Sequence, residues 1–368
     1  MKRERIFVCA RQKRSKPCRV CEYFNNAKAE IRPVSSGLDL SALPKCQRTV
    51  KDMSKTPSAS YHLPVLMHEV LEALQVRPDG TYVDGTAGGG GHSFAIASQL
   101  TDGRLYALDQ DPDAIREASA RLSGLPATVL QTNFEHMRSA LAPFGVDGVD
   151  GILLDIGVSS HQLDDGSRGF SFHEDAPLDM RMSQSGQTAA DLCNTLSEQQ
   201  LSDIFFRYGE EKFSRRIAAA IVRERETTPI ETTLQLAELI KNAVPAAARR
   251  EKHPARRVFQ ALRIEVNDEL GCLSRAMDEA FDLLNVGGRL AIITFHSLED
   301  RMVKQRFAAW RQGCNCPPQS PVCVCGRTPA AEAVTRKPVR ASEQELQDNP
   351  RSRSAVLRCI EKRHERYI

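Results

Sequence analysis

The sequence predicts an α/β protein with a Rossmann-like sheet and an inserted all-helical domain. Strand-like and helix-like segments alternate from residue 62 to residue 155, which is typical of a parallel sheet covered by helices on both faces. From about residue 168 to residue 259 apolar residues recur at helical spacing and no convincing strand is present. The alternation then resumes, so we expect the helical stretch to be inserted between two strands of one sheet.

Four strands form the first part of the predicted sheet. Short apolar strands are expected at Thr81–Asp84 and Arg104–Asp109. The helical pattern of Asp113–Leu122 separates them from a third strand, Ala127–Leu130. The fourth strand, Gly151–Asp155, is strongly apolar and ends in an acidic residue, as the first two do.

Helices dominate the second part of the chain before strands return. The amphipathic patterns of the insertion are Leu201–Phe206, Phe213–Val222 and Leu234–Val244. A long helix over about Ala261–Leu284, a turn at Gly287-Gly288 and a buried strand at Arg289–Phe295 are expected next. The last two strands are predicted at Ala333–Val339 and Ser354–Ile360.

These patterns divide the chain into three regions. Residues 59–167 and 260–368 are expected to form the discontinuous sheet domain, and residues 168–259 the inserted helical domain. Residues 1–58 form a basic extension with 14 Lys and Arg against 5 Asp and Glu, although the whole chain has a net charge of +3. Because this extension lacks apolar periodicity, we expect it to be disordered, with Met53 as an alternative translation start.

The apolar content of the chain bears on its location. No apolar h-region follows the N-terminus and no run of about 18 apolar residues occurs, so neither a secretory signal nor a membrane span is predicted. We therefore expect a cytoplasmic protein.

A glycine-rich segment after the first strand predicts a cofactor site. Residues Asp84–His92 contain four consecutive glycines and open a helix, where glycine permits a tight turn and a close approach of the backbone to a ligand. The free N–H groups of a helix start favour an anion. The spacing lacks the pattern G-x-G-x-x-G, which makes an NAD-dependent enzyme a poor fit.

Acidic residues at the strand ends narrow the choice of ligand. Asp84 is placed to face an ammonium group, and Asp109 can accept hydrogen bonds from both hydroxyls of a ribose. Asp155 ends a third strand, and ligands of open α/β sheets bind outside the carboxyl ends of the strands. S-adenosylmethionine offers an ammonium, a carboxylate and a ribose but no pyrophosphate, so it suits this set.

Several sequence blocks occur in an order that is distinctive. They are His62–Leu66, Asp84–His92, Asp150–Ser160, Arg168–Phe172, Pro177–Met182, Tyr208–Glu211, Phe259–Ile264, Phe295–Arg301 and Asn349–Ser354. In these blocks, from about residue 61 to residue 360, the chain resembles the MraW/RsmH family of 16S rRNA (cytosine-N4) methyltransferases. The resemblance implies a class I methyltransferase domain that methylates the exocyclic N4 amine of a specific cytosine in the decoding region of 16S rRNA.

The resemblance also implies roles for individual residues. Contacts to S-adenosylmethionine are implied for Gly90, Gly91, His92, Asp109, Phe134, Asp155 and Gln162, in addition to Asp84. The catalytic candidates are Asp155, Ser159 and His296. Phe134 can pack on an adenine or belong to the core, and His296 can contact the RNA or be a buried, satisfied histidine.

The chemistry of an exocyclic amine sets a requirement for the site. Its lone pair is delocalised into the ring, so a hydrogen-bond acceptor that finally takes a proton is needed. Many amino-methyltransferases have an Asn/Asp-Pro-Pro-aromatic motif after the fourth strand, and here Asp155–Ser160 has neither a proline pair nor an aromatic residue. Asp155 is therefore the candidate acceptor, and Phe170 or Phe172 is the candidate stacking aromatic unless both are packing residues.

Basic residues in and beside the insertion are the candidates for RNA contact. The nominated residues are Arg181, Lys252, His253, Arg256 and Arg257, together with Arg215 and Arg216 unless these lie on a solvated helix face. The expected partner is 16S rRNA within the small ribosomal subunit. The oligomeric state stays open, with a dimer as one option.

Four cysteines form a compact group near the C-terminus. Cys314, Cys316, Cys323 and Cys325 suit a tetrahedral zinc site, although the one-residue spacing is tighter than usual. Reduced thiols in a loop are the alternative, and Cys18-x-x-Cys21 is a weaker metal candidate.

Two other functions compete with the RNA methyltransferase. A DNA or small-molecule methyltransferase would methylate duplex DNA or a free nucleotide as well as RNA. A binding or assembly protein would keep the cofactor site without turnover, but the intact set of Asp84, Asp109 and Asp155 argues against it.

Overall fold

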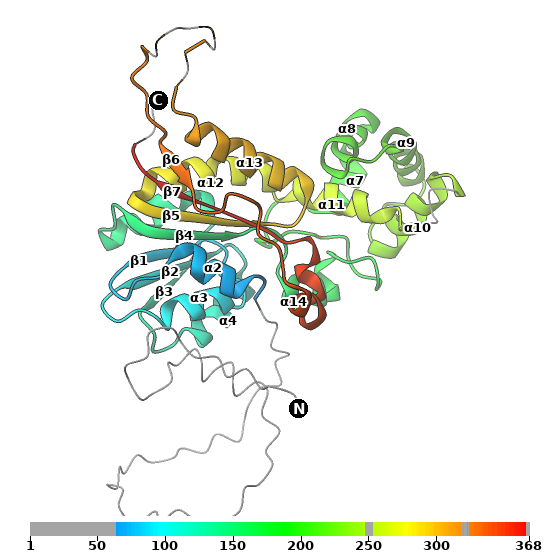
Figure 1. The fold of residues 1–368 in the computed structure, drawn as a ribbon. Helices are drawn as coiled ribbons and strands as arrows, with labels where there is room; N and C mark the ends of the chain where they lie inside the picture. Colours follow the sequence, from blue (N-terminus) through cyan, green and yellow to red (C-terminus); the bar gives the residue numbers. More distant parts are fainter. Residues whose placement is uncertain are drawn as a thin grey trace, which may run out of the picture. The chain divides into compact units, whose positions relative to one another are not determined.

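The structure is a computed structural model, and it describes residues 64–246, 253–314, 316–317, 319, 322 and 324–365. Within these residues seven strands form a sheet with the order β3-β2-β1-β4-β5-β7-β6 (Figure 1). The strands are β1 (Thr81–Asp84), β2 (Arg104–Asp109), β3 (Ala127–Gln131), β4 (Val149–Asp155), β5 (Leu284–Thr294), β6 (Ala331–Ala333) and β7 (Val356–Lys362). The predictions made for residues 1–58 lie outside the described residues.

The first five strands run parallel, and the last two are antiparallel to their neighbours. β1 pairs with both β2 and β4, so the carboxyl ends of these three strands lie side by side. β5 continues the parallel part beside β4, and β7 pairs antiparallel with β5 and β6. The parallel sheet that the alternation of strands and helices predicted is therefore confirmed for β1 to β5.

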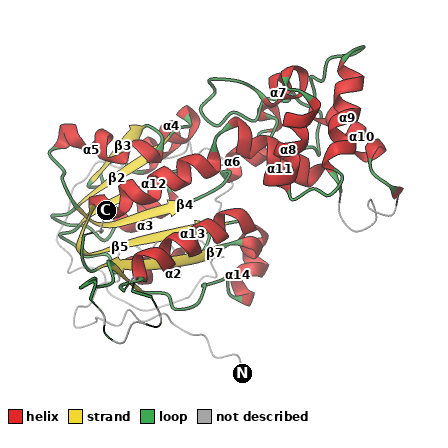
Figure 2. Ribbon diagram, turned by 90° about the horizontal axis from the view of Figure 1, so that it is seen from above, coloured by secondary structure: helices red, strands yellow, loops and turns green. Residues whose placement is uncertain are grey.

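Helices cover both faces of the sheet (Figure 2). Apart from five helices of the insertion that are given below, the α-helices of the described residues are α2 (Met67–Leu74), α3 (Gly91–Ala97), α4 (Pro112–Arg121), α5 (Met137–Leu141), α6 (Ser160–Asp164), α12 (Glu269–Leu283), α13 (Ser297–Arg311) and α14 (Glu343–Asp348). Successive side chains of a strand point to opposite faces, so each strand serves two layers. In β4, Leu153 packs with α2 and α3, whereas Ile152 and Leu154 pack with α12 and α13.

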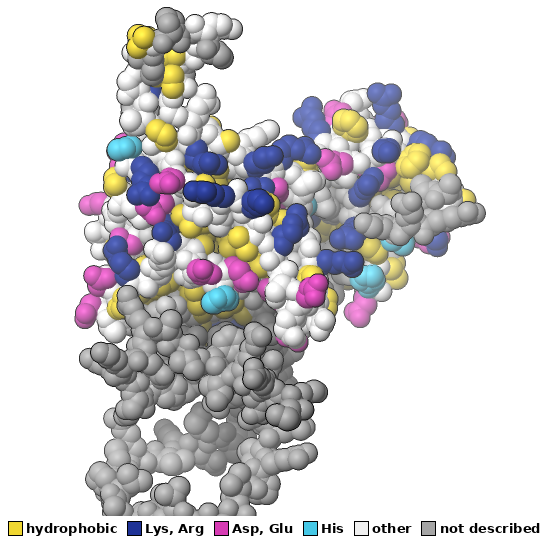
Figure 3. All heavy atoms as spheres, viewed as in Figure 1, with side chains coloured by type: hydrophobic (Ala, Val, Ile, Leu, Met, Phe, Trp, Pro, Cys, Tyr) yellow, Lys and Arg dark blue, Asp and Glu magenta, His cyan; other side chains and the backbone are white. Residues whose placement is uncertain are grey.

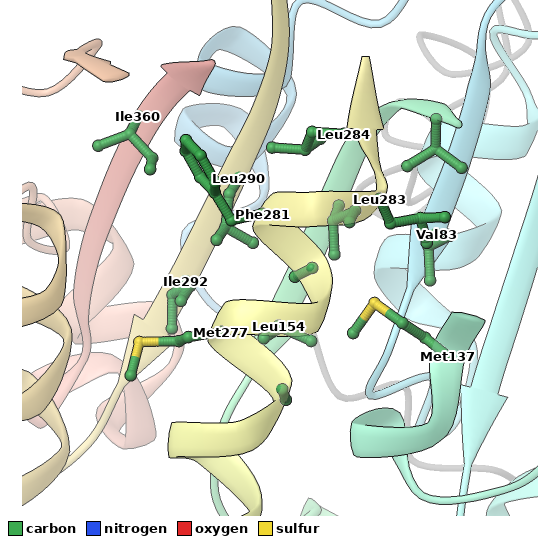
Figure 4. Close-up of a cluster of buried hydrophobic side chains, with 14 of the residues drawn as sticks. Val83, Met137, Leu154, Met277, Phe281, Leu283, Leu284, Leu290, Ile292 and Ile360 are labelled. Atoms are coloured by element: carbon green, nitrogen blue, oxygen red, sulfur yellow. The ribbon is translucent and has the colours of Figure 1, made fainter. Parts of the chain in front are cut away.

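The larger of the two sheet cores lies between β4, β5 and the pair α12 and α13. Figure 4 shows Phe281 of α12 beside Leu290 of β5, and Met277 of α12 beside Ile292 of the same strand. Phe281 is fully buried and stacks on Trp310 of α13 at 4.3 Å between ring centroids. This packing holds α13, and the loop that precedes it, against the end of β5.

Five of the helices that lie between β4 and β5 in the sequence share a hydrophobic cluster of their own. They are α7 (Ala189–Thr195), α8 (Glu198–Gly209), α9 (Ser214–Arg225), α10 (Thr233–Ala243) and α11 (Ala255–Val266). The predicted fold class, a Rossmann-like sheet with a helical insertion, is confirmed. Because α11 runs across residue 260, the boundary proposed there stays a prediction.

Three predicted elements differ from the structure. The long helix over 261–284 is wrong, because Asp268 adopts the left-handed conformation (φ 46°) and separates α11 from α12. β5 starts at Leu284 rather than at Arg289, since Leu284 pairs with Val149 before a register shift. β6 ends at Ala333, and beyond it only Val339 bridges to β7.

Candidate active site

The structure brings Asp84, Asp109 and Asp155 to the ends of three adjacent strands. Asp84 ends the central strand β1, with Asp109 at the end of β2 on one side and Asp155 at the end of β4 on the other. The Asp84 side chain is completely buried. Their mutual electrostatic effect is direct, because the charge of Asp84 raises the pKa of both Asp109 and Asp155.

The turn after β1 ties these acids together. The backbone N–H of Thr86 donates to Oδ1 of Asp84 at 3.1 Å, and its hydroxyl accepts from the backbone N–H of Asp155 at 2.6 Å. The backbone N–H of Gly88 donates to Oδ2 of Asp109 at 2.8 Å. The glycine turn therefore sets the positions of all three strand ends.

Two glycines of this turn are required by geometry. Gly90 precedes α3 with a φ of 75°, a left-handed conformation that costs other residues free energy. Gly91 lies so close to Pro64 that a β-carbon would collide with the proline ring. One turn later, Ser93 donates to Oδ2 of Asp84 at 2.6 Å and fixes that carboxyl group from the helix side.

The acids are held in an environment that opposes negative charge. Burial, followed by the charges of Asp84 and Glu299, raises the pKa of Asp155 from 3.8 to about 8. Burial likewise raises the pKa of Asp109 to about 6, against hydrogen bonds from Asp111 and Gly88 that lower it. Such a site favours a cation, because a positive charge would stabilise the ionised carboxylates.

His92 lies beside Asp155 as a neutral side chain. Its Nε2 is 3.6 Å from Oδ2 of Asp155, which is longer than a hydrogen bond. Burial lowers the pKa of His92 to about 4, so neither partner carries a full charge near pH 7 in this pair. The His92–Asp155 contact is therefore a polar contact and not an ion pair.

The residues at the strand ends fit S-adenosylmethionine. Oδ1 of Asp155 is buried and has no hydrogen-bond partner in the part of the chain that the structure describes, so a donor or cation is needed there. Asp109 lies at the strand end expected for a ribose contact, whereas the Asp84 carboxyl is completely buried and accepts from Thr86 and Ser93, so its contact with an ammonium group stays a prediction. Phe134 follows β3 and is partly buried, with its β-carbon 3.0 Å from the position that a β-carbon at Gly85 would take.

Gln162 is connected to the cofactor site through Asp111. Its amide nitrogen donates to Oδ2 of Asp111 at 2.8 Å, and the backbone N–H of Asp111 donates to Oδ1 of Asp109 at 2.9 Å. Arg168 also donates to Asp111, at 3.0 Å, and to the backbone oxygens of Arg181 and Met182. The sequence singled out Arg168 only as part of a block, and nothing in its spacing indicates this buried contact.

The structure gives Ser159 a position at the start of α6. Its hydroxyl accepts from the backbone N–H of Gln162 at 3.2 Å, and its own N–H donates to the Gln162 side chain at 3.0 Å. Both groups are thus engaged in a reciprocal cap. A catalytic part for Ser159 stays a prediction.

His296 belongs to a polar network at the start of α13. It caps the helix with Glu299, whose Oε2 accepts from the backbone N–H of Phe295 at 2.8 Å. Nε2 of His296 lies 3.0 Å from Oε1 of the fully buried Glu299. Glu269 lies in the same cluster and is held by Arg263 through two contacts of 2.7 and 2.8 Å.

Sequence reasoning missed the Arg263–Glu269 pair and the role of Glu299. The segment His296-Ser297-Leu298-Glu299 has the three-residue spacing of a capping box, which was the available signal. Because the charge of Glu299 raises the pKa of Asp155, this network acts on the candidate acceptor. The pairing of Arg263 with Glu269 requires the break between α11 and α12, which the sequence did not predict.

The RNA candidates differ in how exposed and how engaged they are. The guanidinium of Arg181 donates two hydrogen bonds to the Asp179 carboxylate, at 2.9 and 2.7 Å, so it is already paired within the protein. Arg257 donates to the backbone oxygen of Glu210 at 3.3 Å, and Arg256 is exposed. His253 stacks on Phe172 at 4.9 Å between ring centroids. Lys252 lies outside the described residues.

The two aromatic candidates pack with the insertion. Phe172 contacts Phe259 edge-on at 5.1 Å as well as His253. Phe170 is buried in the same cluster, with the Arg168 guanidinium 5.9 Å from its ring centroid. These contacts agree with the packing alternative for both rings. Arg215 and Arg216 are exposed on α9.

None of the helices in the described ranges has both the length and the apolar character needed to cross a membrane.

Comparisons with known proteins identify the family of this chain. The model of the MraW methylase family matches residues 59–363. A protein of Symbiobacterium thermophilum called ribosomal RNA small subunit methyltransferase H is 57% identical over 309 residues, which cover 83% of this chain and 97% of that protein. A protein of the same name from Heliobacterium modesticaldum is 52% identical over 308 residues, covering 82% and 98%.

A solved rRNA methylase structure from Streptococcus thermophilus is 13% identical and has a TM-score of 0.38, covering 83% of this chain and 100% of that one. This likeness is too weak to carry an argument. The family match confirms the expected cofactor, S-adenosylmethionine, at the level of the family. From the extent of the family match and the identity to these relatives, the chain belongs to the MraW methylase family.

Proposed function

We propose that this protein transfers a methyl group from S-adenosylmethionine to the exocyclic N4 amine of a specific cytosine in the decoding region of 16S rRNA. The observation that carries the proposal is the arrangement of Asp84, Asp109 and Asp155 around one glycine turn. The relatives at 57% and 52% identity, both named as small-subunit rRNA methyltransferases, support RNA of the small subunit as the substrate. The N4 amine of cytosine comes from the resemblance in the sequence blocks.

The chain supplies the binding groups for the methyl donor. S-adenosylmethionine supplies an electrophilic methyl group when it is bound. Asp109 accepts the ribose hydroxyls, and the turn at Gly88–Gly91 lets the backbone approach closely. Asp84 and Asp155 provide negative charge for the cationic parts, and Phe134 provides an apolar surface. The main contribution of these residues is alignment, which can account for a large part of the rate of a displacement reaction.

Asp155 is the proposed acceptor for the cytosine amine. Its Oδ1 has no hydrogen-bond partner among the described residues and its pKa is raised to about 8, so it is a stronger base than an exposed carboxylate once ionised. It can accept a hydrogen bond from the amine and take the proton that the amine loses. The charge of Glu299 adds to the effect of burial and of Asp84 on Asp155, and His296 caps the same helix, α13, with Glu299.

The surface near α13 supports RNA as a partner. Figure 3 shows Lys and Arg side chains gathered over α13 and the helical insertion. Exposed basic residues there are Arg301, Lys304, Arg215, Arg216 and Arg256. Basic side chains in this arrangement position phosphates, while a base to be methylated must leave its stack to reach a buried carboxyl group.

The proposal is tested by methyl transfer to free 16S rRNA, isolated small subunits and whole ribosomes, with duplex DNA and a free nucleotide as competing substrates, followed by mass mapping of the modified nucleoside. We expect N4-methylation of one cytosine. Asp155→Asn should lower the rate by about 100-fold or more, whereas Asp102→Asn, which changes an exposed carboxyl, should not.

Other outcomes of this experiment would refute the proposal. Equal methylation of duplex DNA or a free nucleotide would favour the broader methyltransferase alternative. Donor binding without transfer to any RNA would indicate an assembly protein.

A further inference from the structure

We propose that the loop between α13 and β6, residues 312–330, binds a structural zinc ion through Cys314, Cys316 and Cys325. This site takes no part in the methyl-transfer chemistry described above. One ligand sulfur from each of the three cysteines lies within 4.8 Å of the others. Three thiols from two segments of the loop, separated by eight residues of sequence, therefore meet at one point.

The sulfur separation matches metal ligation. The Sγ atoms of Cys314 and Cys325 are 3.6 Å apart. A tetrahedral site with Zn–S bonds of about 2.3 Å has an S···S edge of about 3.8 Å, whereas a disulfide bond is only about 2.05 Å long. The observed distance is close to the tetrahedral edge.

A backbone contact supports thiolate character at the first ligand. The N–H of Cys316 donates to Sγ of Cys314 at 3.3 Å. A hydrogen bond to a ligating sulfur offsets part of its negative charge and orients it, as outer contacts do at metal sites generally. One residue separates Cys314 from Cys316, which is a short spacing for zinc ligands. This short spacing also places the backbone N–H of Cys316 against Sγ of Cys314.

Two apolar side chains in the described part of this loop are exposed to solvent. Val322 and Val324 are 68% and 86% exposed. Its two ends are fixed, because Trp310 and Ala330 are buried in the sheet core and Gly313 lies against Pro329. Segments that cannot build a core commonly depend on a metal or disulfide for their structure. Zinc would close this loop between its fixed ends.

The three thiolates supply three of the four positions of the tetrahedral coordination that structural zinc prefers, and the fourth is left to a further ligand. Cys323 lies outside the described residues. Binding would release the thiol protons to solvent, so zinc affinity should fall as the pH is lowered.

The test measures zinc in the full chain purified under reducing conditions without a metal-affinity tag. We expect about one zinc per chain in the wild type. The double variant Cys314→Ser/Cys316→Ser should lose it. The matched control Cys18→Ser/Cys21→Ser also removes two thiols and should retain it. Zinc retained by the first variant and lost by the second, or no zinc in the wild type, would overturn the proposal.

A second measurement works on the wild type and does not depend on the folding of a variant. The protein is alkylated with iodoacetamide before and after a chelator is added, and the modified cysteines are mapped by mass spectrometry. Cys314, Cys316 and Cys325 should be protected until the chelator removes zinc. Equal modification with and without the chelator, or a disulfide within the group, would refute zinc ligation.

Discussion

Nε2 of His92 lies 3.6 Å from Oδ2 of Asp155, and burial keeps both side chains neutral near pH 7. In water the aspartate would be ionised at this pH and would attract a protonated histidine. Here the cost of burying either charge exceeds the attraction between them. Asp155 therefore holds a proton in the ligand-free protein and is ready to release it when a cation enters the site.

The affinity for S-adenosylmethionine should depend on pH through Asp109. The pKa of Asp109 is about 6, and the ionised carboxylate is the form that accepts both ribose hydroxyls. As the pH falls below about 6, the affinity should fall by up to about tenfold per pH unit. Calorimetric titrations across this range check the slope. Asp109→Asn should bind weakly with a flatter profile, and an unchanged slope in this variant would contradict the assignment.

The stability of the ligand-free protein should fall as the pH rises from about 6.5 to about 8. The folded pKa of Asp155, about 8, is above its ordinary value of 3.8, so the unfolded chain ionises first and gains relative stability. The contribution is fully present below about pH 4 and is lost as the pH rises through about 8. The pKa of His92 is lowered from 6.5 to about 4, so between these two pH values His92 makes the folded state more stable as the pH rises. This opposes the effect of Asp155 below about pH 6.5, and the loss of stability due to Asp155 is therefore expected above that pH.

Urea unfolding of the wild type and Asp155→Asn over this pH range measures the effect. In the wild type the free energy of unfolding should fall by an amount on the order of a few kcal/mol because Asp155 ionises, and Asp155→Asn should lack this part of the fall. Parallel curves for the two proteins would show that Asp155 ionises normally in the folded state.

Gly91→Ala should damage the cofactor site more than Gly89→Ala. A β-carbon at Gly91 collides with the ring of Pro64, whereas at Gly89 it lies 2.9 Å from the exposed end of Glu117, which can move away. We expect a loss of about 1–3 kcal/mol in stability for the first variant and less than about 1 kcal/mol for the second. Thermal unfolding with donor titration compares them, and equal effects would speak against the close approach.

Arg168→Ala should destabilise the protein strongly. Arg168 and Asp111 are both nearly buried, and removal of the arginine leaves the carboxylate with the neutral amide of Gln162 but without its charged partner. The expected cost is about 3–5 kcal/mol. Arg116→Ala, at a side chain that is 77% exposed, should cost less than about 0.5 kcal/mol. A similar denaturation midpoint for both variants would contradict the buried pair.

Arg256→Glu should weaken RNA binding in a salt-dependent way without changing the affinity for S-adenosylmethionine. Loss of one phosphate contact should reduce the slope of log affinity against log salt by about 1. Arg104→Glu makes the same charge change at the start of β2, at the opposite end of that strand from Asp109, and is the control. Equal losses would indicate a general charge effect and not a contact at Arg256.

The sequence was sufficient to predict the sheet and the three acids because both depend on local signals. Apolar runs that end in Asp84, Asp109 and Asp155 mark strands and their carboxyl ends, and glycines mark the turn. The break at Asp268 was not predictable, since a left-handed aspartate has no distinctive neighbours there. The hydrogen bonds of Arg181 to Asp179 were not predictable either, because an arginine can pair with any of several acidic residues and the fold decides which one is near.

The most direct test of the cofactor site is a calorimetric titration of S-adenosylmethionine into the wild type, Asp109→Asn, Asp155→Asn and Asp102→Asn at one pH. The account predicts one donor per wild-type chain, a loss of about tenfold or more in affinity for the first two variants, equal to about 1.4 kcal/mol, and none for the third. No binding to the wild type, or the same affinity in all four proteins, would contradict it.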